Sequence, residues 1–314
     1  MSLPKLPAIR ELVKLFGLSA KSQLGQNFIL DKNITDKIVR TASLAADTPL
    51  VVEVGPGPGL LTRSILDTPV PNVVVIEKDP RFQPTLTQLA EATQHRVKVL
   101  QGDALRTPHA AILEKAGMDL TTARDLPIPS VHIMGNLPFN IATPLLLQWL
   151  HMIPEAQGLF GVSNKGAIMT LMFQKEVGDR MAAPVSSHER GRLAVMTQSV
   201  CDVEKVYKVP STVFVPKPKV DASVIQMTPK KVKLLDDAAT YKTLENLLRF
   251  YFTKKRKTVG HITKRLIKEV GSEHQESVAA LEDILDFQAR PSDIDTPAYC
   301  QAAKHLHHHG IFIP

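Results

Sequence analysis

An Asn-Leu-Pro-Phe tetrapeptide, Asn136 to Phe139, directly follows the apolar run Val131 to Met134 and Gly135. The Asn136 side-chain oxygen and the Leu137 carbonyl oxygen are two acceptors on consecutive residues, and Pro138 stiffens the turn that carries them. Two such acceptors can each take one N–H of an aromatic amine, which draws the nitrogen lone pair out of the ring plane. The tetrapeptide therefore indicates chemistry at an exocyclic amino group such as that of adenine.

Phe139 adds a flat apolar ring to the same tetrapeptide. Such a ring suits stacking on a base that has been flipped or looped out of its strand. The alternative interpretation is an ordinary core phenylalanine. A buried asparagine beside it would then lack an evident role, which favours the stacking interpretation.

Groups that could hold an adenosine-type ligand follow three other apolar runs. The run Val51 to Val54 leads into the glycine turn Gly55 to Gly59, where Gly57 and its neighbours allow close approach of a ligand to the backbone. Glu77 could accept hydrogen bonds from both ribose hydroxyls, and Asp103 could accept one from an adenine amino group. A structural turn and helix-capping acids are the alternatives. Three such run ends in succession favour an adenosine-type cofactor, and nicotinamide cofactors stay open at this point.

The sequence gives no support for a metal site. Cys201 and Cys300 are far apart and lack ligand spacing, which fits a reducing compartment and argues against a disulfide framework. We interpret the histidines between His305 and His309 as solvated side chains and assign no metal to them. An adenosine-type cofactor with a methyl group on a sulfonium could methylate an exocyclic amino group without a metal, because such a cofactor carries the activated group itself.

Four short β-branched runs position these groups, at 51–54, 73–76, 97–100 and 131–134. Their alternation with helical patterns predicts an α/β fold with a parallel, doubly wound, Rossmann-like sheet. Because ligands of such sheets lie outside the carboxyl ends of the strands, we expect the four turns to line one cleft. Strands and loops are expected over 203–229 and charged helices over 235–270. We therefore predict a catalytic domain at 1–230 and a small helical domain at 231–314.

The positive charge is concentrated in one region. The whole chain has a net charge of +7, and the range 205–269 contains 16 Lys and Arg against 5 Asp and Glu. A solvated face and a polyanionic partner are both open interpretations of this block.

The N-terminal residues 1–16 also leave two interpretations open. Apolar residues at three- and four-residue spacing lie beside Lys and Arg, which is typical of an organelle transit peptide and of an ordinary first helix. The chain has no run of about 18 apolar residues, so we expect no membrane span.

Nearly the whole chain resembles one known family, the small-subunit rRNA adenine N6,N6-dimethyltransferases, including their mitochondrial transcription-factor-B branch. The stretches that carry the resemblance are Gln26-Asn27-Phe28-Ile29, Gly55 to Gly59, Glu77-Lys78, Asp103-Ala104, Asn136 to Phe139, Gln174 to Val177, Phe214 to Asp221 and Lys254 to Lys257. Phe139 stands where the wider family has tyrosine, and the mitochondrial branch tends to carry phenylalanine there. Ile29 in place of leucine should be nearly neutral.

The resemblance implies a monomeric enzyme of the mitochondrial matrix, less expected in the cytoplasm, that uses S-adenosylmethionine to dimethylate two adjacent adenines in a small-subunit rRNA hairpin. It implies cofactor contacts from Gln26 to Ile29, Gly55, Gly57, Glu77, Lys78, Asp103, Ala104 and Asn136. It implies base stacking by Phe139 and Phe214, and RNA contacts by Lys217, Lys219, Lys254, Lys255, Arg256 and Lys257. The same branch contains mitochondrial transcription initiation factors, which is the alternative function. An RNA-binding assembly factor with incidental methylation is a further alternative.

Overall fold

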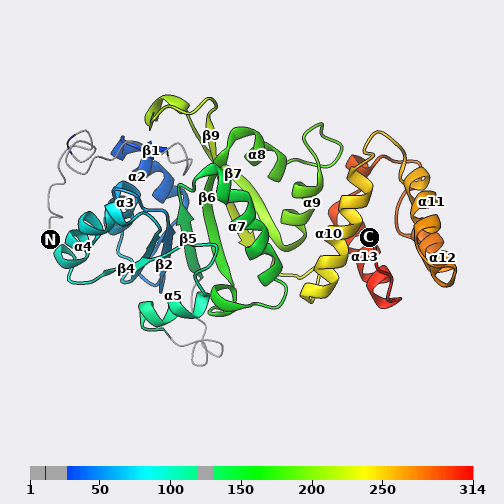
Figure 1. The fold of residues 1–314 in the computed structure, drawn as a ribbon, viewed down its shortest axis with the longest axis horizontal. Coiled ribbons are helices and arrows are strands. Elements are labelled where there is room, and N and C mark those ends of the chain that lie inside the picture. Colours follow the sequence, from blue (N-terminus) through cyan, green and yellow to red (C-terminus); the bar gives the residue numbers. More distant parts are fainter. Residues whose placement is uncertain (1–10, 12–26, 119–129, 314) are drawn as a thin grey trace. The chain divides into compact units, whose positions relative to one another are not determined.

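The computed structural model describes residue 11 and the ranges 27–118 and 130–313 (Figure 1). The predicted cofactor residue Gln26 lies outside these ranges. So does the N-terminal segment 1–16, apart from Glu11, so its two interpretations stay predictions.

The described chain divides into two compact units. The first unit comprises Met1–Gln148, Ala156–Gly178 and Glu204–Pro229, and the second comprises Trp149–Glu155, Asp179–Val203 and Lys230–Pro314. The second unit thus draws two earlier segments together with everything after Pro229. The assignment of roles to 1–230 and 231–314 stays a prediction.

A seven-stranded sheet with the order β4-β3-β2-β5-β6-β9-β7 forms the centre of the fold. Its strands are β2 Val51–Val54, β3 Val73–Glu77, β4 Val97–Gln101, β5 Val131–Gly135, β6 Ala167–Gln174, β7 Cys201–Val209 and β9 Ala222–Pro229. Strands β4, β3, β2, β5 and β6 run parallel to one another, and β9 runs antiparallel to β6. The four predicted strands and the Rossmann-like α/β class are confirmed.

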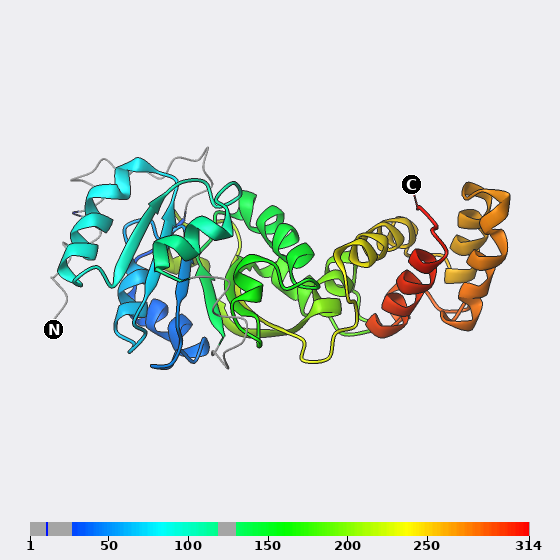
Figure 2. The same cartoon turned by 90° about the horizontal axis from the view of Figure 1, so that it is seen from below.

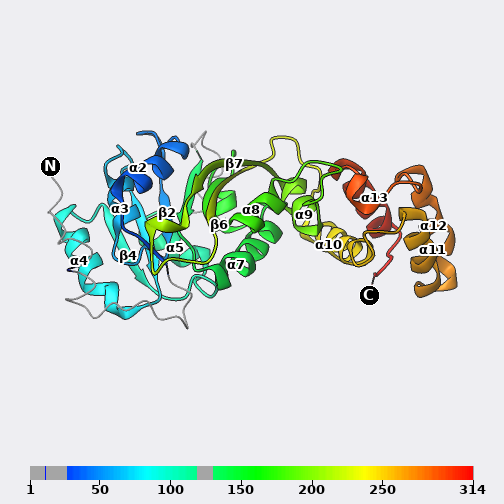
Figure 3. The same cartoon turned by 90° about the horizontal axis from the view of Figure 1, so that it is seen from above.

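Burial explains why these strands could be read from the sequence. All residues of β2, β3 and β5 are buried, as expected for a sheet covered on both faces. Figure 3 shows α2 and α3 on one side of the sheet and α5 and α7 on the other. The helices of this part are α2 Lys32–Thr41, α3 Leu60–Leu66, α4 Gln83–Ala92, α5 His109–Ala116, α7 Phe139–Met152 and α8 Lys175–Met181.

A two-stranded sheet includes Phe28 and Ile29 of the predicted cofactor segment, Gln26 to Ile29. Strand β1, Phe28–Ile29, pairs antiparallel with β8, Phe214–Val215, so that Ile29 faces Phe214 in register. The backbone N–H of Leu30 extends this pairing by donating to the Val213 carbonyl at 3.3 Å. This small sheet brings together segments that are almost 190 residues apart in the sequence.

The second unit is helical (Figure 2). Its helices are α9 Arg192–Val200, α10 Ala238–Phe252, α11 Val259–Glu269, α12 Gln275–Ala279 and α13 Thr296–His308. Helix α10 has an apolar stripe that is fully buried, namely Leu244, Leu247, Leu248 and Tyr251. Buried Arg190 joins distant segments of this unit by donating to the Ile294 carbonyl at 3.2 Å and to the Thr296 hydroxyl at 3.0 Å. No helix in the described ranges is long and apolar enough to cross a bilayer.

Candidate active site

The carboxyl ends of four neighbouring strands meet at one edge of the sheet. Parallel pairing sets Val54 beside Ile76 and Glu77 beside Gln101. Two hollows lie along this edge within the first unit, and both are lined by Gly55, Glu77 and Pro138. The structure therefore brings the turns after β2, β3, β4 and β5 into one elongated cleft.

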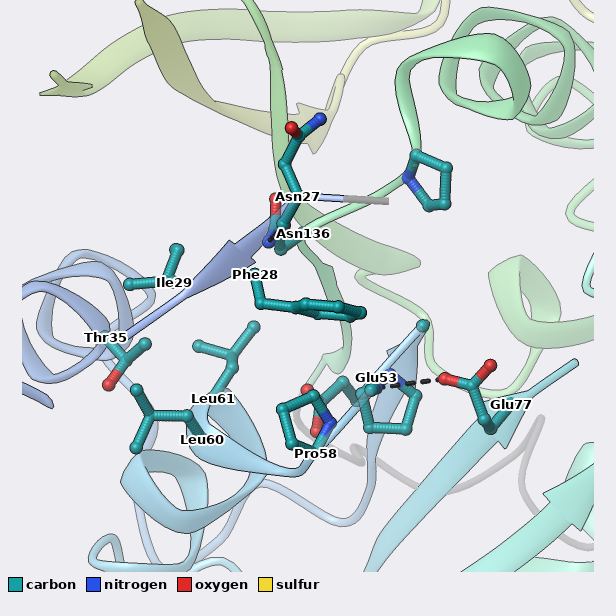
Figure 4. Close-up of a pocket in the computed structure, with 14 residues that line it drawn as sticks. Asn27, Phe28, Ile29, Thr35, Glu53, Pro58, Leu60, Leu61, Glu77 and Asn136 are labelled. Atoms are coloured by element: carbon teal, nitrogen blue, oxygen red, sulfur yellow. Dashed lines mark hydrogen bonds between the residues drawn. The ribbon is translucent and has the colours of Figure 1, made fainter. Parts of the chain in front are cut away.

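The glycine turn packs closely against Phe28 of the predicted cofactor segment. Gly57 has a φ of +52°, and a Cβ at this position would approach the Phe28 ring to 3.0 Å. The Phe28 ring also packs edge-on against Phe82, with ring centroids 5.5 Å apart. In Figure 4 the Phe28 ring lies between Asn136 and Pro58. Glycine is thus needed at position 57 both for its backbone conformation and for the closeness of this ring.

Glu77 is held at the end of β3 by backbone donors. Its Oε2 accepts from the Gly57 N–H at 2.9 Å (Figure 4). Its Oε1 accepts from the Asp79 N–H at 2.7 Å. The side chain is buried, and burial raises the pKa of Glu77, while these N–H groups act in the opposite direction. Each carboxylate oxygen still has a lone pair for a ligand hydroxyl.

Asp103 and Lys78 form the end of the second hollow, which Ala104 also lines. The Lys78 ammonium donates to Asp103 Oδ2 at 2.9 Å, and the Leu105 N–H donates to Oδ1 at 3.1 Å. The hydrogen bond from Lys78 is the largest cause that lowers the pKa of Asp103. Asp103 is therefore an ionised acceptor at neutral pH, placed one strand away from Glu77.

The Asn-Leu-Pro-Phe loop leaves β5 at the centre of the cleft. Gly135 passes so close to β2 that a Cβ there would lie 2.7 Å from the Val54 carbonyl oxygen. Asn136 follows, half-buried, and its Nδ2 donates to the Asn27 backbone oxygen at 2.8 Å. Pro138 closes the turn with its carbonyl accepting from Ile141 and Ala142, so α7 begins at Phe139. Phe139 is half-buried.

The other predicted substrate residues are distributed over both units. Phe214 is only 2% exposed and belongs to the core that also contains Ile29, so its ring is covered in this structure. Lys217 and Lys219 lie on the loop that follows β8, where both are exposed. The basic residues Lys254 to Lys257 form an exposed turn between α10 and α11 in the second unit.

Several residues of the first hollow were not singled out from the sequence. Thr35, Pro56, Leu60 and Leu61 line it together with Glu53. Glu53 had a detectable signal, because a carboxylate interrupts the apolar run of β2. Its oxygens are buried without a hydrogen-bond partner among the described residues. Burial, together with the charge of Glu77, raises the pKa of Glu53 to about 8.

The sheet, its glycine turn and the acid that ends β3 define a Rossmann-like methyltransferase. Residues 17–288 match the ribosomal RNA adenine dimethylase family. Mitochondrial dimethyladenosine transferase 1 of Xenopus tropicalis is 40% identical, over 93% of this chain and 82% of its own length. Its human counterpart is also 40% identical, over 91% of this chain and 80% of its own. The chain therefore belongs to the ribosomal RNA adenine dimethylase family, and it is an rRNA adenine dimethyltransferase that uses S-adenosylmethionine.

Two solved structures agree with this fold. A dimethyladenosine transferase from Plasmodium falciparum superposes with a TM-score of 0.69 at 22% identity, covering 91% of this chain and 100% of that one. The 23S rRNA methyltransferase ErmE gives a TM-score of 0.59 at 24% identity, covering 89% of this chain and 99% of its own. At these identities the likeness concerns the fold.

Proposed function

We propose that this chain dimethylates two adjacent adenines in the terminal hairpin of mitochondrial small-subunit rRNA, as a monomer in the matrix, and thereby supports assembly of the small subunit. The relatives named above are mitochondrial dimethyladenosine transferases. The observation that carries the proposal is the orientation of Asn136, which directs an amide oxygen away from Asn27 at the edge of the cleft.

The proposed place of the S-adenosyl group is along this cleft. Glu77, buried and held by two N–H groups, would accept the ribose hydroxyls, and Asp103 and Ala104 with Lys78 would hold the adenine end. The methionine end would then lie in the first hollow, beside Asn27, Gly55 and Asn136. Gln26 and Ile29 complete the proposed contacts, as parts of the same segment.

The chain itself orients and activates the base. Bound S-adenosylmethionine supplies a methyl group on a positively charged sulfur. The Asn136 amide oxygen and the Leu137 carbonyl would each accept one N–H of the adenine amino group, which holds its nitrogen in a tetrahedral geometry. Phe139 would stack on the base, so that the amino group of the adenine stays close to these acceptors.

Phe214 is proposed as the second wall of the base slot. Its ring is covered in this structure, while Val215 and Pro216 beside it are exposed. A base that reaches the ring must therefore displace the side chains that cover it. The proposal predicts that these side chains move when RNA binds.

The basic turn of the second unit is proposed to hold the RNA backbone. Lys254, Lys255, Arg256 and Lys257 are exposed, and their side chains form no ion pair with any described residue. The next helix continues this surface, because exposed His261, Lys264, Arg265 and Lys268 recur at three- and four-residue spacing on one face of α11. Lys217 and Lys219 of the first unit would add further phosphate contacts.

The test is to map dimethyladenosine in mitochondrial small-subunit rRNA from cells that lack this chain. The modification should be lost at two adjacent adenines and should return with the wild-type chain but not with Asn136→Ala. Unchanged modification in the deficient cells would contradict the proposal. The transcription-initiation alternative is not favoured by the relatives' names, and run-off transcription with the purified chain examines it directly.

A further inference from the structure

A hydrogen bond fixes the orientation of the Asn136 side-chain amide. Its Nδ2 donates to the backbone oxygen of Asn27 at 2.8 Å, across 109 residues of sequence. A carbonyl oxygen can only accept, so the amide must turn its NH₂ group toward Asn27. The amide oxygen is then directed away from Asn27, and it is this oxygen that the reaction needs as an acceptor.

Asn27 is itself held in place by the neighbouring strands. It directly precedes β1, which pairs with β8. Phe28, the next residue, packs on Phe82 and over Gly57. The position of the Asn27 carbonyl therefore depends on strand pairing and on aromatic packing, all of which lie within the first unit.

We propose that the Asn27 backbone carbonyl is a positioning group for catalysis, which sets the amide orientation of Asn136. Ordering of the cofactor segment and formation of the acceptor for adenine would then be a single event. The segment would have a second task besides contacting the cofactor, because an unanchored amide could present its NH₂ group to the base. This inference rests on the proposed catalytic role of Asn136.

Asn136→Asp separates the two properties of the amide. The introduced carboxylate keeps the acceptor oxygen but cannot donate to Asn27, and its charge is repelled by the carbonyl oxygen. We expect kcat at saturating cofactor to fall at least about tenfold at pH 8, since misplacement at the reacting atoms is costly. Relative to the wild type at each pH, kcat should recover as the pH is lowered, because the protonated carboxyl can donate again.

A double-mutant cycle keeps the proposal testable if the carboxyl disturbs the loop in some other way. Phe28→Ala loosens the residue beside Asn27 and leaves Asn136 itself unsubstituted. It should lower kcat at saturating cofactor in the wild-type background and have much less effect in Asn136→Asp, where the hydrogen bond is already broken. If Phe28→Ala lowers kcat by the same factor in the wild-type and Asn136→Asp backgrounds, the proposal is overturned.

A spectroscopic measurement gives a readout apart from activity. In the cofactor-free protein, one side-chain amide proton of Asn136 should exchange slowly with solvent, and Phe28→Ala should remove this protection. Fast exchange in the wild type would overturn the proposal. Asn33→Asp, which adds the same charge at an exposed position of α2, is the matched control and should leave kcat and the amide signal unchanged.

The outcomes also distinguish this inference from the proposed function. If Asn136→Ala remains active, the catalytic role of Asn136 is wrong. If Asn136→Ala is inactive while Asn136→Asp retains more than about half of the wild-type kcat at pH 8, only the positioning role of Asn27 is overturned.

Discussion

The cleft of the first unit and the basic turn of the second unit differ in how their polar groups are held. Glu77, Asp103 and Asn136 are buried or half-buried, and each accepts or donates a hydrogen bond shorter than about 3 Å. Lys254 to Lys257 are exposed to solvent, without ion pairs among the described residues. One region presents a small number of fixed groups, and the other presents a diffuse positive charge.

This difference has a consequence for function. Fixed groups act through geometry, so a single substitution should remove most of their effect. Exposed charges act through a summed field that salt screens, so the effects of removing them should be graded and roughly additive. Chemistry should therefore fail abruptly in the first region, and RNA affinity should decline gradually in the second.

The largest effect is expected for Asn136→Ala. Removing one preorganised polar group that stabilises a transition state costs about 10²- to 10³-fold in rate, so single-turnover methyl transfer should fall by that factor. Cofactor affinity, measured by calorimetry, should change by only a few fold. A variant that keeps more than about a tenth of the wild-type rate would break the comparison.

Glu77→Gln should act on cofactor affinity. The substitution removes a charged acceptor and sets an amide against the N–H groups of Gly57 and Asp79. Hydrogen bonds to charged groups contribute about 1.5–3 kcal/mol, so Kd for S-adenosylmethionine should rise about ten- to hundredfold. The single-turnover rate at saturating cofactor should change much less, and an unchanged Kd would refute the assigned contact.

The basic turn should show the graded behaviour. Replacing Lys254, Lys255, Arg256 and Lys257 with alanine should weaken RNA binding about tenfold or more near physiological salt. The slope of log affinity against log salt should decrease by about 0.7–0.9 for each phosphate that is no longer neutralised. Lys242→Ala and Lys304→Ala are matched controls, because both lysines lie in exposed ion pairs of the same unit. A salt slope equal to that of the wild type would place the RNA elsewhere.

The smallest effect concerns stability and follows from Glu53. Its pKa is about 8 when folded, against an ordinary value of 4.5, so the folded chain binds one extra proton between these values. The wild type should lose stability as the pH rises through this window, and Glu53→Gln removes that loss. The variant should be more stable than the wild type at about pH 8 and no more stable at about pH 4, since the new amide also lacks partners. The measurement is thermal unfolding of the wild type and Glu53→Gln at several pH values. If Glu53 were ionised in the folded chain, the difference in stability between the two proteins would be the same at every pH.

Four of the five parallel strands could be predicted from the sequence, and β2 and β3 were the clearest because both of their faces are buried and therefore almost uniformly apolar. The fifth, β6, was not predicted. The turns after the predicted strands were also identifiable, since glycines and acids stand out against those runs.

The hydrogen bond from Asn136 to the backbone of Asn27 could not be predicted. Every residue has a backbone carbonyl, so the residue type at position 27 gives no sign of this role. Burial of Phe214 was equally hidden, since a core ring and a stacking ring look alike in sequence. The contribution of 149–155 and 179–203 to the second unit depends on long-range interactions such as that of Arg190 with Thr296.

The most direct test of the central claim is methyl transfer from labelled S-adenosylmethionine to a hairpin from the 3′ end of mitochondrial small-subunit rRNA, or to an assembled subunit precursor. Nucleoside analysis should find dimethyladenosine with the wild-type chain and none with Asn136→Ala. Wild-type protein that binds both substrates yet yields no dimethyladenosine on either RNA would contradict the account.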